Sequence, residues 1–257
     1  GKVRLIHKSA SEFGEPQWEF GMSRRGFTAD GRIVASDIAD GIARLALIDT
    51  KTGQRSEIAT PFQEIKELRV GKGFVVFLGG SGDEARSLVR LDLKTGRHEL
   101  LRRGSSLKVD PRYLSHARPI VFPSTDGRSA HAFHYPPANP AFIGPAAERP
   151  PLIVLSHGGP TSQATPTFNP AIQFWTSRGF AVVDVNYGGS SGYGRDYRRR
   201  LNGQWGVVDI DDCVNAAKYL VAQGLADGER LAIRGGSAGG YTTLGALAFR
   251  PGVFKAG

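Results

Sequence analysis

The fold is decided by the stretch Arg234-Gly235-Gly236-Ser237-Ala238-Gly239-Gly240. An apolar run, residues 230–233, precedes it, and a helix-like run, residues 241–249, follows it. A strand, a Gly-x-Ser-x-Gly turn and a helix in this order are the context of a nucleophile elbow. Glycine at positions 235 and 239 lets the strand and the helix pass closely, because glycine has no Cβ. The alternative is a glycine-rich turn with an incidental serine.

The chemistry of acyl transfer explains why a serine is expected in this turn. A serine hydroxyl is a weak nucleophile, so it has to be exposed and held next to a base. The helix that begins after Ser237 directs free backbone N–H groups toward developing negative charge. The stretch therefore predicts a serine nucleophile at position 237.

The composition is that of an ordinary globular protein. The chain has 257 residues, of which 40% are hydrophobic and 22% charged, which allows one large domain or two smaller ones. The sequence has no apolar run of 18 residues and no signal-peptide core in residues 1–20, so we expect no membrane partner. Cys213 is the only cysteine, which excludes an intrachain disulfide and fits a reducing, cytoplasmic compartment.

The net charge is +9, but the basic residues are scattered along the chain. A nucleic-acid-binding protein would gather them on one face, so we expect no nucleic-acid partner. The densest cluster, Arg195 to Arg200, is interpreted as a solvated face or loop. A contact with a phosphate or an acidic substrate is the alternative.

Two similar segments lie in the N-terminal part of the chain. Residues 43–53 and 87–96 each combine an alternating strand with an Asp-x-Lys-Thr-Gly turn, and Asp49 and Asp92 are 43 residues apart. Several strands per repeat at this period are typical of a β-propeller blade. Residues 1–115 are therefore predicted to form about two propeller blades, fewer than the four to eight that close a ring. A small meander with a repeated turn is the alternative.

The composition changes in residues 116–257, where strands and helices alternate. Residues 152–156 and 180–187 read as buried strands, residues 168–178 and 209–223 as helices, and the last five residues as the start of another strand. This order predicts a parallel sheet with helices on both faces, and its active loops follow the carboxyl ends of the strands. His157, Tyr187 and Ser237 all lie at such ends.

Three aspartates, Asp209, Asp211 and Asp212, stand at the start of the predicted helix 209–223. A helix N-terminus favours negative charge, which gives them a structural explanation. A metal pair formed by Asp211 and Asp212 is the alternative, but no histidine lies nearby in the sequence. We expect no metal and no cofactor.

As a set, four motifs resemble the prolyl oligopeptidase family of serine peptidases, in its acylaminoacyl-peptidase and dipeptidyl-peptidase-like branch. They are His157-Gly158-Gly159-Pro160, residues 186–194, residues 205–209 and residues 235–240. The resemblance implies an incomplete α/β-hydrolase domain in residues 116–257, preceded by a partial propeller. One departure is Gly188, where many members of the family carry an arginine.

The resemblance also implies the roles of individual residues. Ser237 is the expected nucleophile, and the backbone N–H groups of Gly159 and Ala238 are the expected oxyanion donors. His157 resembles a structural loop histidine of the family and not the triad base. In this fold the triad acid and histidine follow the serine. The 20 residues after Ser237 contain no Asp, Glu or His. We therefore expect that the sequence is a piece of a longer protein and that the acid and the base lie beyond residue 257. The piece alone is expected to be inactive.

The resemblance predicts a serine peptidase that hydrolyses short peptides through an acyl-enzyme, with a peptide substrate as its partner. Two alternatives stay open: an esterase or amidase on the same fold, and a non-catalytic propeller binding protein. The sequence does not predict an oligomeric state.

Overall fold

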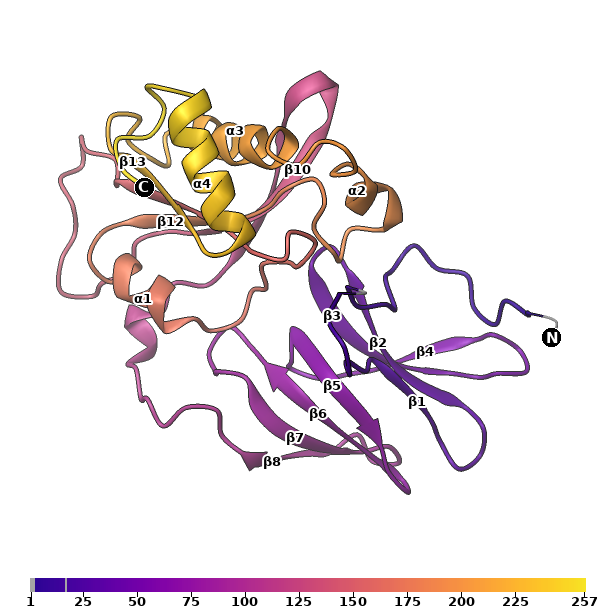
Figure 1. Ribbon diagram of the computed structural model, residues 1–257. Coiled ribbons are helices and arrows are strands. Elements are labelled where there is room, and N and C mark those ends of the chain that lie inside the picture. The colour runs from indigo at the N-terminus through magenta and orange to yellow at the C-terminus, as the bar shows by residue number, and fades with distance from the viewer. Residues whose placement is uncertain (1–2, 17) are drawn as a thin grey trace. The chain divides into compact units, whose positions relative to one another are not determined.

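The computed structural model describes residues 3–16 and 18–257. The chain forms two compact units (Figure 1). The first takes in the chain up to residue 107 together with residues 165–168 and 191–194, and the second contains residues 108–164, 169–190 and 195–257. Two short segments of the later sequence thus belong to the first unit.

The first unit contains two four-stranded antiparallel sheets, with strand orders β1-β2-β3-β4 and β5-β6-β7-β8. In both sheets each strand pairs with its neighbour in sequence. Such a meander follows from alternating strands joined by short turns. The strands are β1 (Arg25–Phe27), β2 (Ile33–Ala39), β3 (Ile42–Ile48), β4 (Arg55–Ile58), β5 (Glu64–Val70), β6 (Phe74–Gly80), β7 (Ser87–Asp92) and β8 (His98–Arg102).

The repeated turn lies at the same place in both sheets, after β3 and after β7. The Asp49 carboxylate accepts hydrogen bonds from the backbone of residues 51 and 52, and that of Asp92 accepts them from residues 94 and 95. Gly53 and Gly96 close the turns at φ 75° and 71°, a conformation that glycine adopts without a steric penalty. The turn chemistry expected from the sequence is confirmed.

The two sheets of the first unit share one apolar core. Its members come from β2, β3, β5, β6 and β7 and include Ile38, Leu45, Leu68, Phe77 and Leu91, all almost fully buried. Burial of such side chains is worth about 1.5–3 kcal/mol each, which is the main force that holds the sheets together.

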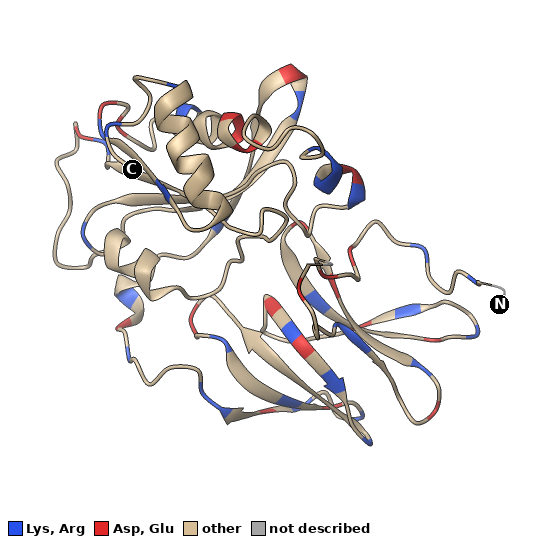
Figure 2. Ribbon diagram, viewed as in Figure 1, with Lys and Arg blue, Asp and Glu red and all other residues tan. Residues whose placement is uncertain are grey.

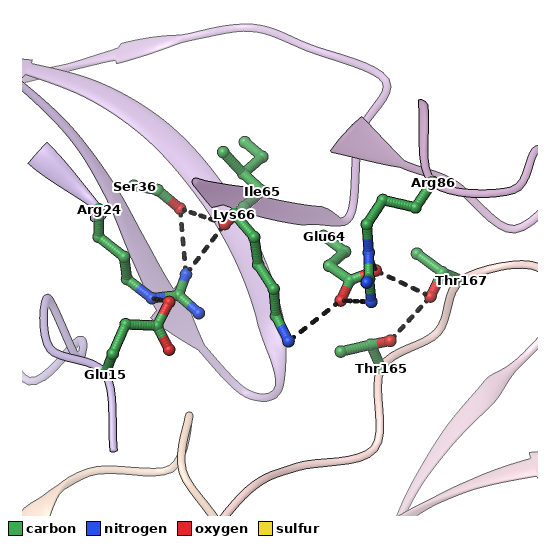
Figure 3. A network of polar contacts seen from close by, with 9 residues as sticks. All are labelled: Glu15, Arg24, Ser36, Glu64, Ile65, Lys66, Arg86, Thr165 and Thr167. Carbon is green, nitrogen blue, oxygen red and sulfur yellow. Dashed lines mark hydrogen bonds and ion pairs between the residues drawn. The ribbon is translucent and has the colours of Figure 1, made fainter. Parts of the chain in front are cut away.

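Buried charges supplement this core (Figure 3). The Arg24 guanidinium donates to the Ile65 carbonyl at 3.1 Å and forms an ion pair with Glu15 at 2.5 Å. Burial is the main cause that raises the pKa of Glu15. The Glu64 carboxylate is paired with Arg86 at 2.6 Å and accepts a hydrogen bond from the Thr167 hydroxyl at 3.3 Å. These bonds tie β5 to neighbouring segments of the same unit.

The second unit is built on a mixed five-stranded sheet with the order β13-β11-β12-β10-β9. β11, β12 and β13 run parallel, whereas β9 and β10 form an antiparallel hairpin at the other edge. After β13, the Lys255 amide donates to the Leu231 carbonyl, so the strand expected near the C-terminus appears as a single bridge. The strands are β9 (Arg118–Pro123), β10 (Ser129–Tyr135), β11 (Leu152–Ser156), β12 (Ala181–Asn186) and β13 (Leu231–Gly235).

Helices cover both faces of this sheet (Figure 1). α3 (Val208–Ala222) and α4 (Ala238–Phe249) pack on one face, against a core that includes Val183 and Val185. α1 (Pro170–Thr176) packs on the other face. It is shorter than the helix expected over residues 168–178, because Asn169 caps it and Pro170 is its first residue.

The aspartates at the start of α3 make tertiary contacts beyond the dipole effect expected from the sequence. The Asp209 carboxylate accepts from the Thr242 hydroxyl at 2.5 Å, and the Asp211 carboxylate is paired with Arg250 at 2.6 Å. The Asp212 carboxylate accepts from the Ser124 hydroxyl and, at 2.7 Å, from the Gly188 amide. Among the described residues, no group of three or more His, Cys, Asp or Glu is placed to hold a metal ion.

Basic and acidic residues are interspersed over both units (Figure 2). The Arg195–Arg200 cluster includes the short helix α2 (Arg195–Arg199). Arg200 is fixed, since its guanidinium stacks on Tyr197 at 4.4 Å and donates to the Ser129 carbonyl at 2.7 Å. Of the helices in the described part of the chain, none has both the length and the apolar character needed to cross a membrane.

Asp184 in β12 is a half-buried residue whose carboxyl group has a testable pH dependence. It lies between Phe133 on β10 and Leu155 on β11, and burial raises its pKa to about 7. The stability that the protonated Asp184 carboxyl contributes is fully present below the pKa that this group has in the unfolded chain. It is lost as the pH rises through about 7. We expect Asp184→Asn to gain stability relative to the unmodified protein between pH 5 and 8, as measured by urea unfolding of the full-length protein. A pH-independent difference would contradict this expectation.

Candidate active site

Ser237 occupies a sharp turn between β13 and α4. Its backbone has φ 54° and ψ −121°, which is unusual for a residue with a side chain, and the residue is exposed. Conformations of this kind cost about 1–3 kcal/mol and are concentrated at functional sites. The elbow expected from the sequence is therefore present in the backbone.

Two glycines make the turn possible by close packing. A Cβ added at Gly239 would lie 2.0 Å from the Ser156 carbonyl oxygen at the end of β11. A Cβ at Gly235 would lie 2.4 Å from the backbone of Gly239. Only glycine fits at either position, so the spacing of the motif is a packing requirement of the strand and the helix.

The start of α4 provides backbone donors beside Ser237. Ala238 is the first residue of this helix, where N–H groups have no intrahelical acceptor. The N-terminus of a helix also carries a partial positive charge. An oxyanion formed next to Ser237 would be stabilised by both effects.

The loop after β11 lies next to Ser237. A Cβ added at Gly158 would be 3.4 Å from the Ser237 Cβ and 3.9 Å from its Oγ. Gly159 follows at φ 113°, a conformation that favours glycine. The structure thus brings the loops that contain Gly159 and Ser237 together. The roles of the Gly159 and Ala238 N–H groups as oxyanion donors stay a prediction.

His157 is held inside this loop. Its Nδ1 lies 2.9 Å from the Gly158 carbonyl and its Nε2 lies 2.7 Å from the Ser190 hydroxyl. Since a carbonyl only accepts, Nδ1 carries the proton of the neutral ring. The Ser190 hydroxyl also lies 2.8 Å from the Tyr187 carbonyl oxygen, so its one proton is shared between that oxygen and Nε2. Desolvation lowers the pKa of His157 to about 4, which keeps the ring neutral at pH 7.

Tyr187, which follows β12, completes the cluster. Its ring stacks on that of His157 with centroids 4.3 Å apart, and its hydroxyl reaches the carbonyls of His157 and Pro160. The sequence places Tyr187 at the end of a strand but gives no sign that its hydroxyl bonds to the loop after β11. Only the parallel pairing of β11 with β12 reveals that contact.

The Ser237 hydroxyl makes no hydrogen bond to any of the residues 3–16 and 18–257. His157 has both ring nitrogens engaged elsewhere, in agreement with the expectation that it is not the base. The arrangement therefore presents an exposed serine beside backbone N–H donors, which is the combination that acyl transfer requires of a nucleophile and an anion-binding site.

Comparison with known sequences relates this site to peptidases. Residues 166–257 match the model of the prolyl oligopeptidase family. Dipeptidyl aminopeptidase BIII of Pseudoxanthomonas mexicana is 34% identical over 152 residues, which are 58% of this chain and 22% of that protein. The acylamino-acid-releasing enzyme of Arabidopsis thaliana is 37% identical over 106 residues, or 41% of this chain and 14% of that enzyme. The chain thus spans less than a quarter of the length of these two relatives.

Solved structures extend the similarity to nearly the whole chain. A puromycin-hydrolyzing peptidase of Mycobacterium tuberculosis matches 98% of this chain and 38% of its own, with 42% identity and a TM-score of 0.94. Puromycin hydrolase matches 99% of this chain and 38% of its own, with 40% identity and a TM-score of 0.93. Residues 166–257 thus match the prolyl oligopeptidase family, and the similarity to solved peptidase structures extends over nearly the whole chain.

Proposed function

We propose that the protein is a serine peptidase that hydrolyses short peptides through an acyl-enzyme on Ser237. The observation that carries the proposal is the exposed Ser237 at φ 54° on a strand-to-helix turn, beside the glycine loop that follows β11. Strained, exposed serines on such turns are the nucleophiles of α/β hydrolases. The family assignment of residues 166–257 supports the same activity.

In this mechanism the Ser237 Oγ attacks the carbonyl carbon of the scissile amide while a base takes the hydroxyl proton. The N–H groups of Gly159 and Ala238 stabilise the resulting oxyanion. The C–N bond then breaks, and the protonated base gives its proton to the leaving amine. Water, deprotonated by the same base, attacks the ester carbonyl carbon. The bond from this carbon to Oγ breaks and releases the carboxylic acid, and the base returns its proton to Oγ, which restores Ser237. Loss of one oxyanion donor raises the activation free energy by about 2.7–4 kcal/mol.

We infer that the base and its acid lie outside residues 1–257. All six histidines precede Ser237, whereas the triad histidine of this fold follows the serine. His157 is occupied by Gly158 and Ser190, and its lowered pKa makes it a poor proton acceptor. The chain spans 22% of dipeptidyl aminopeptidase BIII and 38% of puromycin hydrolase, which is compatible with this inference.

We also propose that residues 1–115 are two propeller blades and that residues 116–257 are part of the catalytic domain. Two four-stranded antiparallel meanders with the same turn chemistry, 43 residues apart in sequence, support the blades. The five-stranded sheet with helices on both faces supports the α/β-hydrolase part.

The substrates that we propose are amides of amino acids and short peptides. Two proteins described as puromycin-hydrolyzing are similar to nearly the whole chain, and a serine-to-alanine mutant of puromycin hydrolase has been solved in complex with PGG. Puromycin carries an aminoacyl amide, so one acyl-transfer site can serve for both puromycin and small peptides.

A substrate panel tests this proposal on the full-length protein. We expect hydrolysis of aminoacyl and dipeptidyl p-nitroanilides and of puromycin, with kcat/KM in the ordinary enzymatic range of about 10⁴–10⁸ M⁻¹ s⁻¹ for the best substrate. An esterase would instead hydrolyse p-nitrophenyl acyl esters and leave the anilides intact. Absence of turnover on all amides and esters would favour the non-catalytic binding protein.

A further inference from the structure

We propose that Tyr187 is a positioning residue, whose hydroxyl clamps the His157–Pro160 loop and so fixes the Gly159 N–H beside Ser237. The inference rests on the proposed function, because it concerns the oxyanion site of that reaction. It does not require Tyr187 to touch the substrate.

The Tyr187 hydroxyl lies between the two ends of the loop. It is 3.0 Å from the His157 carbonyl oxygen and 2.8 Å from that of Pro160, so its single proton is shared between the two acceptors. The residues between these acceptors are Gly158 and Gly159. Burial raises the pKa of the Tyr187 phenol, so the hydroxyl stays a donor at any working pH.

The clamp acts on a part of the loop that has little stiffness of its own. Glycine has the widest range of backbone conformations, and two consecutive glycines leave the Gly159 N–H free to turn away. Gly158 is the point at which this loop approaches Ser237, with only 3.9 Å between an added Cβ and the Ser237 Oγ. A small rotation of the Gly158–Gly159 segment would therefore move the donor relative to the nucleophile.

A second contact fixes the first half of the loop. The His157 ring stacks on the Tyr187 ring with an angle of 19° between their planes, and the Ser190 hydroxyl lies within hydrogen-bond distance of both His157 Nε2 and the Tyr187 carbonyl oxygen. Ser190 is fully buried and its amide donates to the Tyr187 carbonyl at 2.9 Å. Tyr187, His157 and Ser190 thus form one unit that joins the loop after β11 to the loop after β12.

Tyr187 is itself anchored, as a clamp has to be. Its side chain is fully buried in the core formed with α3 and α4. The next residue, Gly188, donates its amide to the Asp212 carboxylate of α3 at 2.7 Å. The position of the hydroxyl is therefore set by the sheet and by α3, and not by the loop that it holds.

The test compares two tyrosine-to-phenylalanine variants of the full-length protein. Tyr187→Phe removes the clamp and keeps the stacked ring. Tyr197→Phe is the matched control, because the Tyr197 hydroxyl is also buried and donates to a backbone carbonyl, that of Asn186, at 2.6 Å. We expect Tyr187→Phe to lower kcat on an aminoacyl p-nitroanilide by about 10- to 100-fold with KM unchanged, as expected when a donor is misplaced by a fraction of an ångström. Tyr197→Phe should leave kcat within twofold of the unmodified protein.

Affinity for a peptidyl aldehyde separates positioning from a general loss of structure. Its adduct with a serine nucleophile carries an oxyanion, so its affinity should fall in parallel with kcat/KM in Tyr187→Phe. If Tyr187→Phe does not fold, Ser190→Ala replaces it, since this smaller change removes the hydroxyl that contacts His157 Nε2 and the Tyr187 carbonyl and leaves the Tyr187 hydroxyl in place. We expect the same fall in kcat, by a smaller factor, and in aldehyde affinity.

Two results would overturn the clamp. The first is an unchanged kcat and aldehyde affinity in a folded Tyr187→Phe, or in Ser190→Ala if that variant has to be used. The second is an equal loss of kcat in Tyr187→Phe and Tyr197→Phe. Ser237→Ala in the same assay keeps the two hypotheses apart. An inactive Ser237→Ala with an unaffected Tyr187→Phe removes only the clamp, whereas an active Ser237→Ala removes the proposed function as well.

Discussion

Replacing Ser237 by alanine is expected to abolish amide hydrolysis by the full-length protein. The loss in kcat should approach the roughly 10⁶-fold seen when a serine hydrolase loses its nucleophile. The oxyanion donors would remain, so a residual rate above that of water is compatible with the account. The measurement is kcat on an aminoacyl p-nitroanilide, with the Tm of the variant recorded to show that it folds.

The matched control for this variant is Ser177→Ala. Ser177 caps the C-terminal end of α1, just before β12 begins. It therefore lies at the amino ends of the parallel strands, whereas the Ser237 turn lies at their carboxyl ends. This variant should keep full activity. Full activity in a folded Ser237→Ala would refute Ser237 as the nucleophile.

Gly239→Ala is expected to have the largest effect on stability. The added Cβ would lie 2.0 Å from the Ser156 carbonyl oxygen and 2.8 Å from its carbon, so backbone would have to move against backbone. Such overpacking costs about 3 kcal/mol or more, enough to lower the Tm of a unit of this size by about 10 °C. Because the β11–α4 contact also positions Ser237, activity should fall together with stability.

Gly236→Ala is the control for this second variant. Gly236 belongs to the same turn, but an added Cβ meets no atom within 4 Å. Its Tm should therefore stay close to that of the unmodified protein, as is usual for a substitution that makes no new contact. Equal Tm values for the two variants would show that α4 does not pack against β11 as closely as described.

The elbow could be predicted from the sequence because its determinants are local. The apolar strand, the two glycines and the helix start stand next to one another in sequence, and each has a direct backbone reason. The turns at Asp49 and Asp92 could be predicted for the same reason, since each carboxylate bonds to amides two and three residues away.

The remaining features depend on contacts between distant segments. Phe168 donates its amide to the Ser81 carbonyl, which places residues 165–168 in the first unit although they follow β11 in sequence. The Tyr187 hydroxyl finds its acceptors 27 and 30 residues earlier in the chain. No local periodicity reports such pairings, because they arise only when the fold places segments that are distant in sequence side by side.

The most direct test of the central claim is to map the site of a fluorophosphonate adduct on the full-length protein. The labelled protein is digested with trypsin, and the modified peptide is identified by mass spectrometry. We predict one dominant adduct on Ser237, within the peptide that follows Arg234 and extends through α4. A dominant adduct on another serine, in a protein that hydrolyses the anilide substrates, would contradict the account.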